Sequence, residues 1–387
     1  MSTHEACAAS LLNHDTLIEI FHACVELESE SCASTLATES APWVLGHVCQ
    51  SWRRTVMSSP LLWTSIHVSL DNLDSAAQSR ALFLLDLYLS RSASCPLSVS
   101  IHSSKAFQKS PSFLRPLLSA SARWHRLEMD IPVSSYAAFS ALTGFLDLLE
   151  TLHVRLPHQN KTQAVHDFAN LKDGVRLFRF CNNLKYLSLQ DIPYPRDVFH
   201  LPWARLQDLS VYSSSTLVTN FTNLRALHGL RNLTSCSLEC RSTMNARKPQ
   251  NLTLPALRSM TLLSVEHDQD LGGIDVCRMG IVQMLSWLTL PALNHLRLYQ
   301  SSGVQSEAEN SSEDDLVDQI IQLIRRSHCE TEGLQLQLYP SVNEAGMKSI
   351  LDQILPSPER LTLAPHSAYR PYCDRISMSK LFRRVDT

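Results

Sequence analysis

A short segment in which apolar and polar residues alternate recurs along most of the chain, and it constrains the fold more than any other feature. Most copies approximate the form Leu-x-Leu, and several have a further leucine three residues earlier, as at Leu184, Leu206 and Leu233. Such repeats indicate a stacked architecture, because one repeat cannot bury its apolar face alone. The copies lie at 127–129, 152–154, 187–189, 209–211, 236–238, 260–262 and 296–298, with weaker ones at 66–68, 97–99, 336–338 and 361–363.

The alternation within each copy is typical of a β-strand that is buried on one face. Stretches with helical character lie between the copies, at 81–89, 112–121, 163–171, 280–288, 316–324 and 344–354. A strand followed by a helix, repeated in the same order, predicts parallel strands joined by right-handed crossovers. Residues 69–387 are therefore predicted to form an α/β solenoid of about eleven repeats, each of about 20 to 40 residues.

The N-terminal part of the chain predicts a small helical module ahead of the repeats. Thr16 and Glu19 have the spacing of a capping box, which indicates the start of a first helix. Pro42 fits the first turn of a second helix, which is expected to end before Pro60. The apolar stripes of the two helices are Leu17, Ile20, Phe21 and Cys24, and Val44, Leu45, Val48, Cys49, Trp52 and Val56.

Leu61, Leu62 and Trp63 follow the second helix directly. A module this small cannot bury so many large apolar groups by itself. We therefore expect it to bind a partner or to pack on a neighbouring domain.

The runs 17–24 (LIEIFHAC) and 41–66 (APWVLGHVCQSWRRTVMSSPLLWTSI) resemble the F-box, particularly its fungal form. The resemblance covers residues 11–68 and rests on Ile20-Phe21, Val48-Cys49, Trp52-Arg53 and Leu62-Trp63, which occur in order. Leu12-Asn13 stand where the family usually has Leu-Pro.

The F-box resemblance implies an all-α module that docks on a Skp-type adaptor and, through it, on the cullin of a ubiquitin ligase. An apolar helix pair exposed at one end of a chain suits docking into a groove. The alternative is that the same side chains are the core of a helical cap that seals the next domain. The expected adaptor-contacting residues are Leu17, Ile20, Phe21, Leu45, Val48, Cys49, Trp52 and Trp63.

The remainder of the chain, residues 69–387, resembles the leucine-rich repeat family in a long and irregular form often joined to F-boxes. In a stacked array the polar residues of the strands share one face, which is free to contact a ligand. Tyrosine and arginine are frequent at interface hot spots. The expected target contacts are therefore Arg155, Tyr212, Arg297, Tyr299 and Tyr339. The alternative is a merely solvated face.

Composition and motifs exclude several classes of function. The net charge is −3, without the basic excess that nucleic-acid binding requires, so we expect no nucleic-acid partner. The patterns GxGxxG, GxxxxGK[ST], GxSxG and HExxH are absent, and the histidines lack metal-ligand spacing. We therefore expect no catalytic residues, no cofactor and no metal site, although an enzyme of an unrecognised type stays an alternative.

Cysteine usage and apolar run lengths bear on the compartment. The eleven cysteines contain no CxxC pair, and Cys236 and Cys240 are read as buried free thiols. We find no signal-peptide pattern and no membrane-spanning run, so we expect no membrane partner and a cytoplasmic or nuclear location.

The acidic stretch 305–315 is almost free of apolar residues, and it is read as a solvated loop that precedes a helix near Leu316. Its acidic charges could instead bind a basic partner.

Taken together, the patterns predict a substrate-recognition subunit. The N-terminal helices would bind the adaptor and the repeats would bind a target protein, while the ligase partners transfer ubiquitin. A repeat scaffold that acts outside any ligase is the main alternative. The sequence does not indicate the identity of the target.

Overall fold

The computed structural model of the protein describes residues 12–29, 36, 38–71, 74–109, 111–142, 144–157, 174–192, 194–212, 219–241, 251–264, 274–300, 310–329, 334–339, 344–354 and 361–363. The chain forms two compact units. The first comprises Met1–Leu152 and Pro157–Asn183, and the second comprises His153–Leu156 and Leu184–Thr387. The domain boundary expected between residues 68 and 69 falls inside the first unit.

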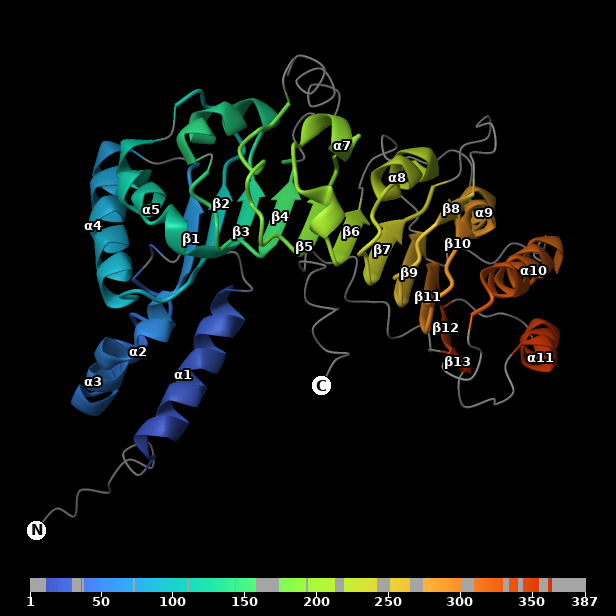
Figure 1. Ribbon diagram of the computed structural model, residues 1–387. Coiled ribbons are helices and arrows are strands. Elements are labelled where there is room, and N and C mark those ends of the chain that lie inside the picture. Colours follow the sequence, from blue (N-terminus) through green and yellow to red (C-terminus); the bar gives the residue numbers. More distant parts are fainter. Residues whose placement is uncertain are drawn as a thin grey trace, which may run out of the picture. The chain divides into compact units, whose positions relative to one another are not determined.

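Parallel strands form the centre of both units (Figure 1). In the first unit β1 (Ser65–Ser69), β2 (Leu97–His102) and β3 (Trp124–Asp130) pair in this order. β4 (Thr151–Arg155) contains the division between the units. In the second unit the order is β5 (Tyr186–Gln190), β6 (Asp208–Tyr212), β7 (Ser235–Glu239), β9 (Ser259–Ser264), β11 (His295–Gln300), β12 (Gln335–Tyr339) and β13 (Leu361–Leu363).

All eleven expected strand positions are confirmed, and the chain has an α/β fold. The pairing register of the second unit shows why the alternating segments form strands. Leu187, Leu209, Cys236, Met260, Leu296 and Leu336 are direct partners on successive strands, and each is at most 1% exposed. The residues two positions later form a second buried row. These rows exist only when neighbouring strands pair without a shift, because a one-residue slip would turn the apolar residues to the opposite face.

Helices and short helical turns connect the strands. The first unit has α4 (Ser75–Arg91), η3 (Ser112–Leu114), α5 (Arg115–Ser119), η4 (Ser121–Arg123) and η5 (Val133–Leu142). The second unit has α7 (Pro195–Val198), η6 (Trp203–Arg205), α8 (Asn220–Leu227), α9 (Ile274–Trp287), α10 (Asn310–Ser327) and α11 (Glu344–Gln353), with a small ladder of β8 (Leu252–Thr253) and β10 (Leu288–Thr289).

Four of the expected helical stretches lie in or largely overlap α4, α9, α10 and α11, and the one at 112–121 is split among shorter turns. The one at 163–171 lies outside the described residues. The prediction that the acidic stretch 305–315 is a loop needs correction. Helix α10 begins at Asn310, so the second half of the stretch is helical. Acidic side chains are favourable in the first turns of a helix, where they meet its positive end. Residues 301–309 lie outside the described residues.

Polar side chains tie successive repeats together through backbone carbonyl groups. In the first unit Asn183 Nδ2 donates to the carbonyl of Asp147 at 2.6 Å. In the second unit Asn232 Nδ2 donates to the carbonyl of Ala204 at 2.7 Å. Both asparagines stand just before a strand, where these bonds satisfy carbonyl groups that the ladder leaves unpaired.

The N-terminal module consists of α1 (His14–Ser29), α2 (Leu45–Val48), α3 (Gln50–Ser58) and η2 (Pro60–Trp63). The capping box expected at Thr16 is wrong, because Asn13 Oδ1 accepts from the Thr16 amide at 2.7 Å and the helix begins at His14. The prediction of a single second helix is also wrong. The helix is broken at Cys49, whose extended backbone ends α2 and whose sulfur accepts from the Trp52 amide at 3.5 Å to begin α3.

An aromatic cluster fixes this module to the first repeat. The rings of Trp43, Trp63 and Tyr88 lie 4.9 to 5.7 Å apart in edge-to-face pairs. The Arg91 guanidinium lies 4.2 Å from the Trp63 ring and 5.0 Å from that of Trp43. Trp63 Nε1 also donates to the Val56 carbonyl at 3.0 Å. Since Tyr88 and Arg91 belong to α4, the module and the first repeat share one core.

We predict that Leu209→Asp lowers the free energy of unfolding by about 3–5 kcal/mol, because it places an unpaired charge in the buried row. Ser188→Asp, on the partly exposed face of β5, is the matched control and should change it by less than about 1 kcal/mol. Chemical denaturation measures both. An unchanged stability in Leu209→Asp would mean that the strand register is wrong.

Trp63→Ala should lower the free energy of unfolding of the first unit by about 3–5 kcal/mol, because a large buried ring is lost from the shared core. Leu61→Ala, two residues away and 55% exposed, should change it by no more than about 0.5 kcal/mol. Equal effects of the two substitutions in chemical denaturation would contradict the shared core.

Candidate interaction surfaces

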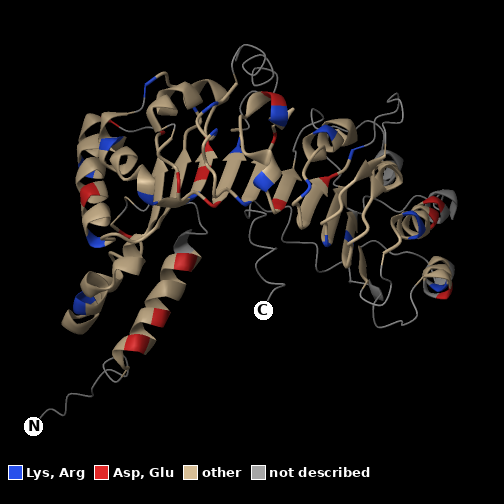
Figure 2. Cartoon of the chain, in the orientation of Figure 1, with Lys and Arg blue, Asp and Glu red and all other residues tan. Residues whose placement is uncertain are grey.

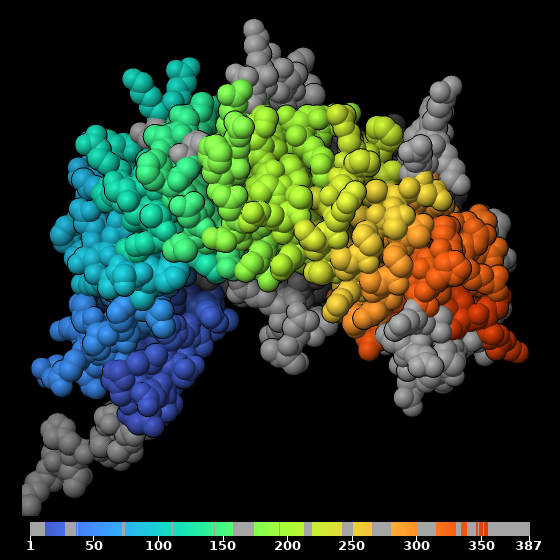
Figure 3. Space-filling view, viewed as in Figure 1, coloured from blue at the N-terminus to red at the C-terminus, as the bar shows by residue number. Residues whose placement is uncertain are grey.

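The N-terminal module exposes more apolar surface than its size requires. Seven of the fifteen large apolar side chains exposed among the described residues lie between positions 12 and 61. They are Leu12, Ile20, Leu27, Val44, Val48, Met57 and Leu61. The helices that carry most of them form a lobe beside α4 (Figure 3). A concentration of this kind marks an interaction surface, whereas scattered exposed apolar residues do not.

The eight expected adaptor-contacting residues divide into two groups. Ile20, Val48 and Cys49 are exposed, and Trp52 is partly exposed. Leu17, Phe21, Leu45 and Trp63 are buried, so the expectation that they contact a partner directly needs correction. Phe21 meets Trp52 edge-to-face at 4.8 Å and holds α1 against α3, and Trp63 belongs to the aromatic cluster. The buried residues therefore shape the surface that the exposed ones form.

Helix α1 carries two apolar stripes with different roles. Leu17 and Phe21 face α3 and the core, while Ile20, Ala23 and Leu27 are exposed and share a second face at i, i+3 and i+7 spacing. A helix with a stripe left over after packing has a surface to offer a partner helix.

The charges of the module are segregated by helix (Figure 2). Helix α1 has four acidic residues and no lysine or arginine. Helix α3 has Arg53 and Arg54 and no acidic residue. The exposed apolar surface is therefore bordered by opposite charges on its two helices, which favours one orientation of a docked partner.

The expected target-contacting residues lie on strands of the second unit, and Arg155, Tyr212, Arg297 and Tyr299 occupy the alternate positions to the buried leucines. Arg155, Arg297 and Tyr299 are partly exposed. Arg297 Nε donates to Gln337 Oε1 at 3.1 Å, and Tyr299 is the direct partner of Tyr339. The side chain of Tyr339 lies outside the described residues.

Tyr212 is the exception, since it is only 4% exposed and does not offer a free contact. The structure therefore brings Arg297, Tyr299 and Tyr339 together on β11 and β12, while Arg155 and Tyr212 lie on β4 and β6. Sequence alternation places a residue on a face, but it does not show whether that face is open.

A buried ion pair on the same face was not anticipated. Glu239 and Arg241 lie at the end of β7, with Arg241 Nε 3.5 Å from Glu239 Oε1 and both side chains largely buried. An acid and an arginine two residues apart point to the same side of an extended chain, which is the signal that could have indicated the pair.

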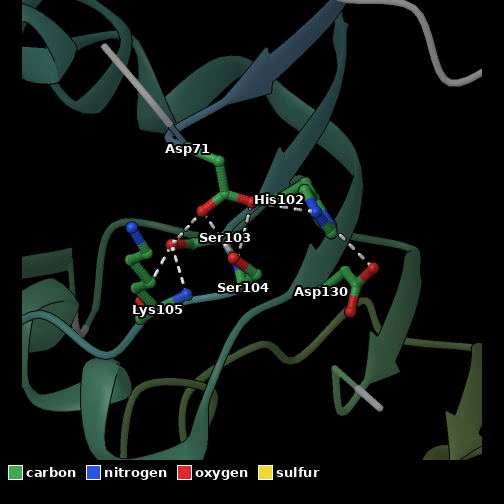
Figure 4. Close-up of polar contacts among 6 residues, drawn as sticks. All are labelled: Asp71, His102, Ser103, Ser104, Lys105 and Asp130. Carbon is green, nitrogen blue, oxygen red and sulfur yellow. Dashed lines mark hydrogen bonds and ion pairs between the residues drawn. The ribbon is translucent and has the colours of Figure 1, made fainter. Parts of the chain in front are cut away.

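A second polar cluster, also not anticipated, joins the ends of β1, β2 and β3 (Figure 4). His102 Nδ1 lies 2.8 Å from Asp130 Oδ2, and its Nε2 lies 3.3 Å from Asp71 Oδ2. Both oxygens of Asp71 accept from the Ser104 amide at 2.9 Å. The residues come from three neighbouring strand ends, so the cluster is visible only once the strands are stacked.

The geometry of this cluster indicates a structural tie. The Ser103 hydroxyl donates to the Lys105 carbonyl at 2.8 Å and lies 3.5 Å from Asp71, with no bond to His102. It therefore does not form the nucleophile–base pair that acyl transfer needs. No group of three or more histidine, cysteine or acidic residues in the described part of the chain could hold a metal ion.

Burial makes Cys181, Cys236 and Cys240 poor candidates for a nucleophile. Cys236 and Cys240 are free and buried, which confirms their interpretation from the sequence. Burial raises the pKa of both thiols, and it raises the pKa of Cys181 to about 12. The reactive thiolate is therefore disfavoured at each of these positions.

Comparison with known proteins adds no family assignment. No model of a known protein family and no curated protein sequence matches the chain. None of the helices in the described ranges is both long enough and apolar enough to cross a membrane.

We predict that the first unit loses stability on acidification through His67 of β1. Burial, and secondarily the charge of Arg126, lowers the pKa of His67 from 6.5 to about 4. The unfolded chain then binds more protons between these values, so stability falls as the pH drops from 6.5 toward 4. The full loss is roughly 3 kcal/mol.

Denaturation at neutral pH and near pH 4 measures this effect against His67→Asn, which cannot titrate. The difference in stability between the two chains should shift in favour of the variant at the lower pH. The same difference at both pH values would rule out burial of a neutral His67.

Proposed function

We propose that this chain is the substrate-recognition subunit of a Skp–cullin–F-box ubiquitin ligase. The observation that carries the proposal is the exposed apolar surface of the N-terminal module, which is held by a buried aromatic framework and has no cover among the described residues. In this proposal α1, α2, α3 and η2 form an F-box-like module, and the strands that follow form an irregular leucine-rich-repeat solenoid.

The F-box-like residues support the proposal by the way they alternate between core and surface. Ile20 is exposed while Phe21 is fully buried, and Val48 is exposed while Leu45 is buried. A helix pair used only as a cap would turn its large apolar residues inward. The departure from Leu-Pro is also accommodated, since Asn13 caps α1 at the place where the proline would begin the family's first helix.

The repeats support the proposal through their regular stacking. In the main sheet of the second unit, each strand from β5 onward pairs in parallel with its neighbour, and the polar residues of successive strands share one face. A rigid face made of many equivalent positions is suited to binding a protein target. Arg297, Tyr299 and Tyr339 form the part of this face that we assign to target contact.

In this function the chain performs no chemistry of its own. It raises the local concentration of a target lysine near the conjugating enzyme, which is catalysis by proximity. Proximity works best when the docking module does not swing freely. The stacking of Arg91 on Trp63 supplies that stiffness within the first unit, because it joins the module to the first repeat through a common core.

A repeat scaffold outside any ligase is the second candidate. The burial of Leu17, Phe21, Leu45 and Trp63 favours it, since these residues would also serve a helical cap. The two candidates differ in what they require of the exposed residues: adaptor docking needs Ile20 and Val48, whereas a cap does not.

We predict that Val48→Asp weakens binding of a purified Skp-type adaptor by about 30-fold or more, the loss typical of a hot-spot anchor of about 2 kcal/mol. Val48 is 58% exposed, so thermal stability should be unchanged. Isothermal titration calorimetry measures the binding.

Phe83→Asp is the matched control, because Phe83 is equally apolar and exposed but lies on α4, outside the module surface. It should leave adaptor binding intact. If the two substitutions had equal effects, or if the unaltered chain bound no adaptor at micromolar concentration, the ligase function would be rejected in favour of the scaffold.

A further inference from the structure

The connections that enter the strands of the second unit carry a basic strip. Since the strands are parallel, their entry ends share one edge of the sheet (Figure 1). The described residues of this unit that lead into β5, β6, β7 and β9 are 184–185, 199–207, 228–234 and 251–258, and none of them is aspartate or glutamate. The lysines and arginines among them form the basic strip: Lys185, Arg205, Arg231 and Arg258.

Backbone hydrogen bonds hold the two ends of the basic strip in register. The Gln207 amide donates to the Lys185 carbonyl at 2.9 Å, and the Thr234 amide donates to the Gln207 carbonyl at 2.8 Å. The Arg258 amide in turn donates to the Thr234 carbonyl at 2.8 Å. Three strand steps of about 4.8 Å therefore separate Lys185 from Arg258, a distance of roughly 14 Å along the edge.

The two inner cations stand on neighbouring repeats of the same edge. Asn232 follows Arg231 and Ala204 precedes Arg205 in the chain. Asn232 Nδ2 donates to the Ala204 carbonyl at 2.7 Å, which ties the two connections together. The basic strip is thus a fixed row of cations that belongs to the second unit.

Two arginines of the strip have hydrogen-bond donors left for a ligand. Arg231 and Arg258 are exposed, and no side chain among the described residues pairs with either guanidinium. The helices that follow β5 and β6 differ, because there Arg225 Nη2 pairs with Asp197 Oδ1 at 3.0 Å. An arginine has five N–H donors and no acceptor, so the two unpaired guanidinium groups call for an anionic partner.

The nearest acid in the sequence does not neutralise the strip. Asp208 opens β6 and is half-buried, and none of the four cations, all of which are described, pairs with it. Burial raises the pKa of Asp208, although hydrogen bonds to Ser235 and Ser210 oppose the rise. This carboxyl group is therefore engaged within the sheet, and the positive charge at the edge stays available.

We propose that the basic strip binds an extended acidic segment of a partner protein. Three of its four cations are arginines, whose planar guanidinium groups can each form two parallel hydrogen bonds to one carboxylate. At about 3.3 Å per residue, four or five residues of an extended segment span the length of the strip. The exposed side-chain amides of Gln207 and Asn294, beside the strip, are further donors to carboxylates.

The spread of the cations favours a run of carboxylates over other anions. A single phosphate group is bound by cations that converge on it, whereas these cations stand on four successive strands of the sheet. A nucleic acid selects a basic excess, whereas the net charge of this chain is −3. If the proposed function holds, on which this consequence rests, the acidic segment belongs to the target of the ligase.

Fluorescence anisotropy of a labelled eight-residue peptide of alternating aspartate and glutamate tests the proposal on the full chain. The chain should bind this peptide, and added salt should weaken the binding because the strip is exposed. Arg231→Glu together with Arg258→Glu should weaken it by about tenfold or more. The control is Arg80→Glu together with Arg115→Glu, which changes the net charge equally at two exposed arginines of the first unit and should weaken binding less than about twofold.

Three outcomes would overturn the proposal. They are no binding of the peptide at low salt, equal losses in the two double variants, and tighter binding of an eight-nucleotide single-stranded DNA than of the peptide. Arg231→Gln together with Arg258→Gln removes the charges without adding repulsion, and it should also weaken binding. The assay contains neither adaptor nor target, so its outcome is independent of whether the chain serves a ligase.

Discussion

The pairing of buried rows between successive parallel strands is the constraint on which the rest of the structure depends. Leu209 is stabilised by burial because Leu187 and Cys236 lie beside it in register, and the same holds for the buried residues of β7, β9 and β11. Each such leucine contributes about 2 kcal/mol relative to an exposed position. Because the rows commit one face of the strands to the core, the connecting helices are expected on that side and not on the polar face.

The same reasoning explains why the N-terminal module is not an independent body. Its helices are too few to enclose a core, and the aromatic cluster of Trp43, Trp63 and Tyr88 completes that core with a residue of the first repeat. What stays outside is a set of apolar side chains with acidic α1 on one side and basic α3 on the other. The module thus shares a core with its neighbour and leaves a set of its own apolar side chains exposed.

The sequence predicted the strands well and the surfaces poorly, for a physical reason. A two-residue period specifies both the strand and its buried face, so the eleven strand positions followed from leucine spacing alone. Exposure depends on what else packs against a residue, which spacing does not record. Phe21 and Trp63 therefore looked like contacts but are core, and Tyr212 looked open but is covered. The tie of Asp71, His102 and Asp130 joins residues distant in the chain and could not be inferred without the stacking.

Affinity purification of the intact chain from its native cells, followed by mass spectrometry, shows whether the exposed helices dock on a ligase. If they do, a Skp-type adaptor and a cullin co-purify with the chain in near-equal amounts, and both disappear together when Val48 is replaced by aspartate. Recovery of other partners without adaptor or cullin, from a chain that remains folded, would contradict the claim that the exposed helices dock on a ligase.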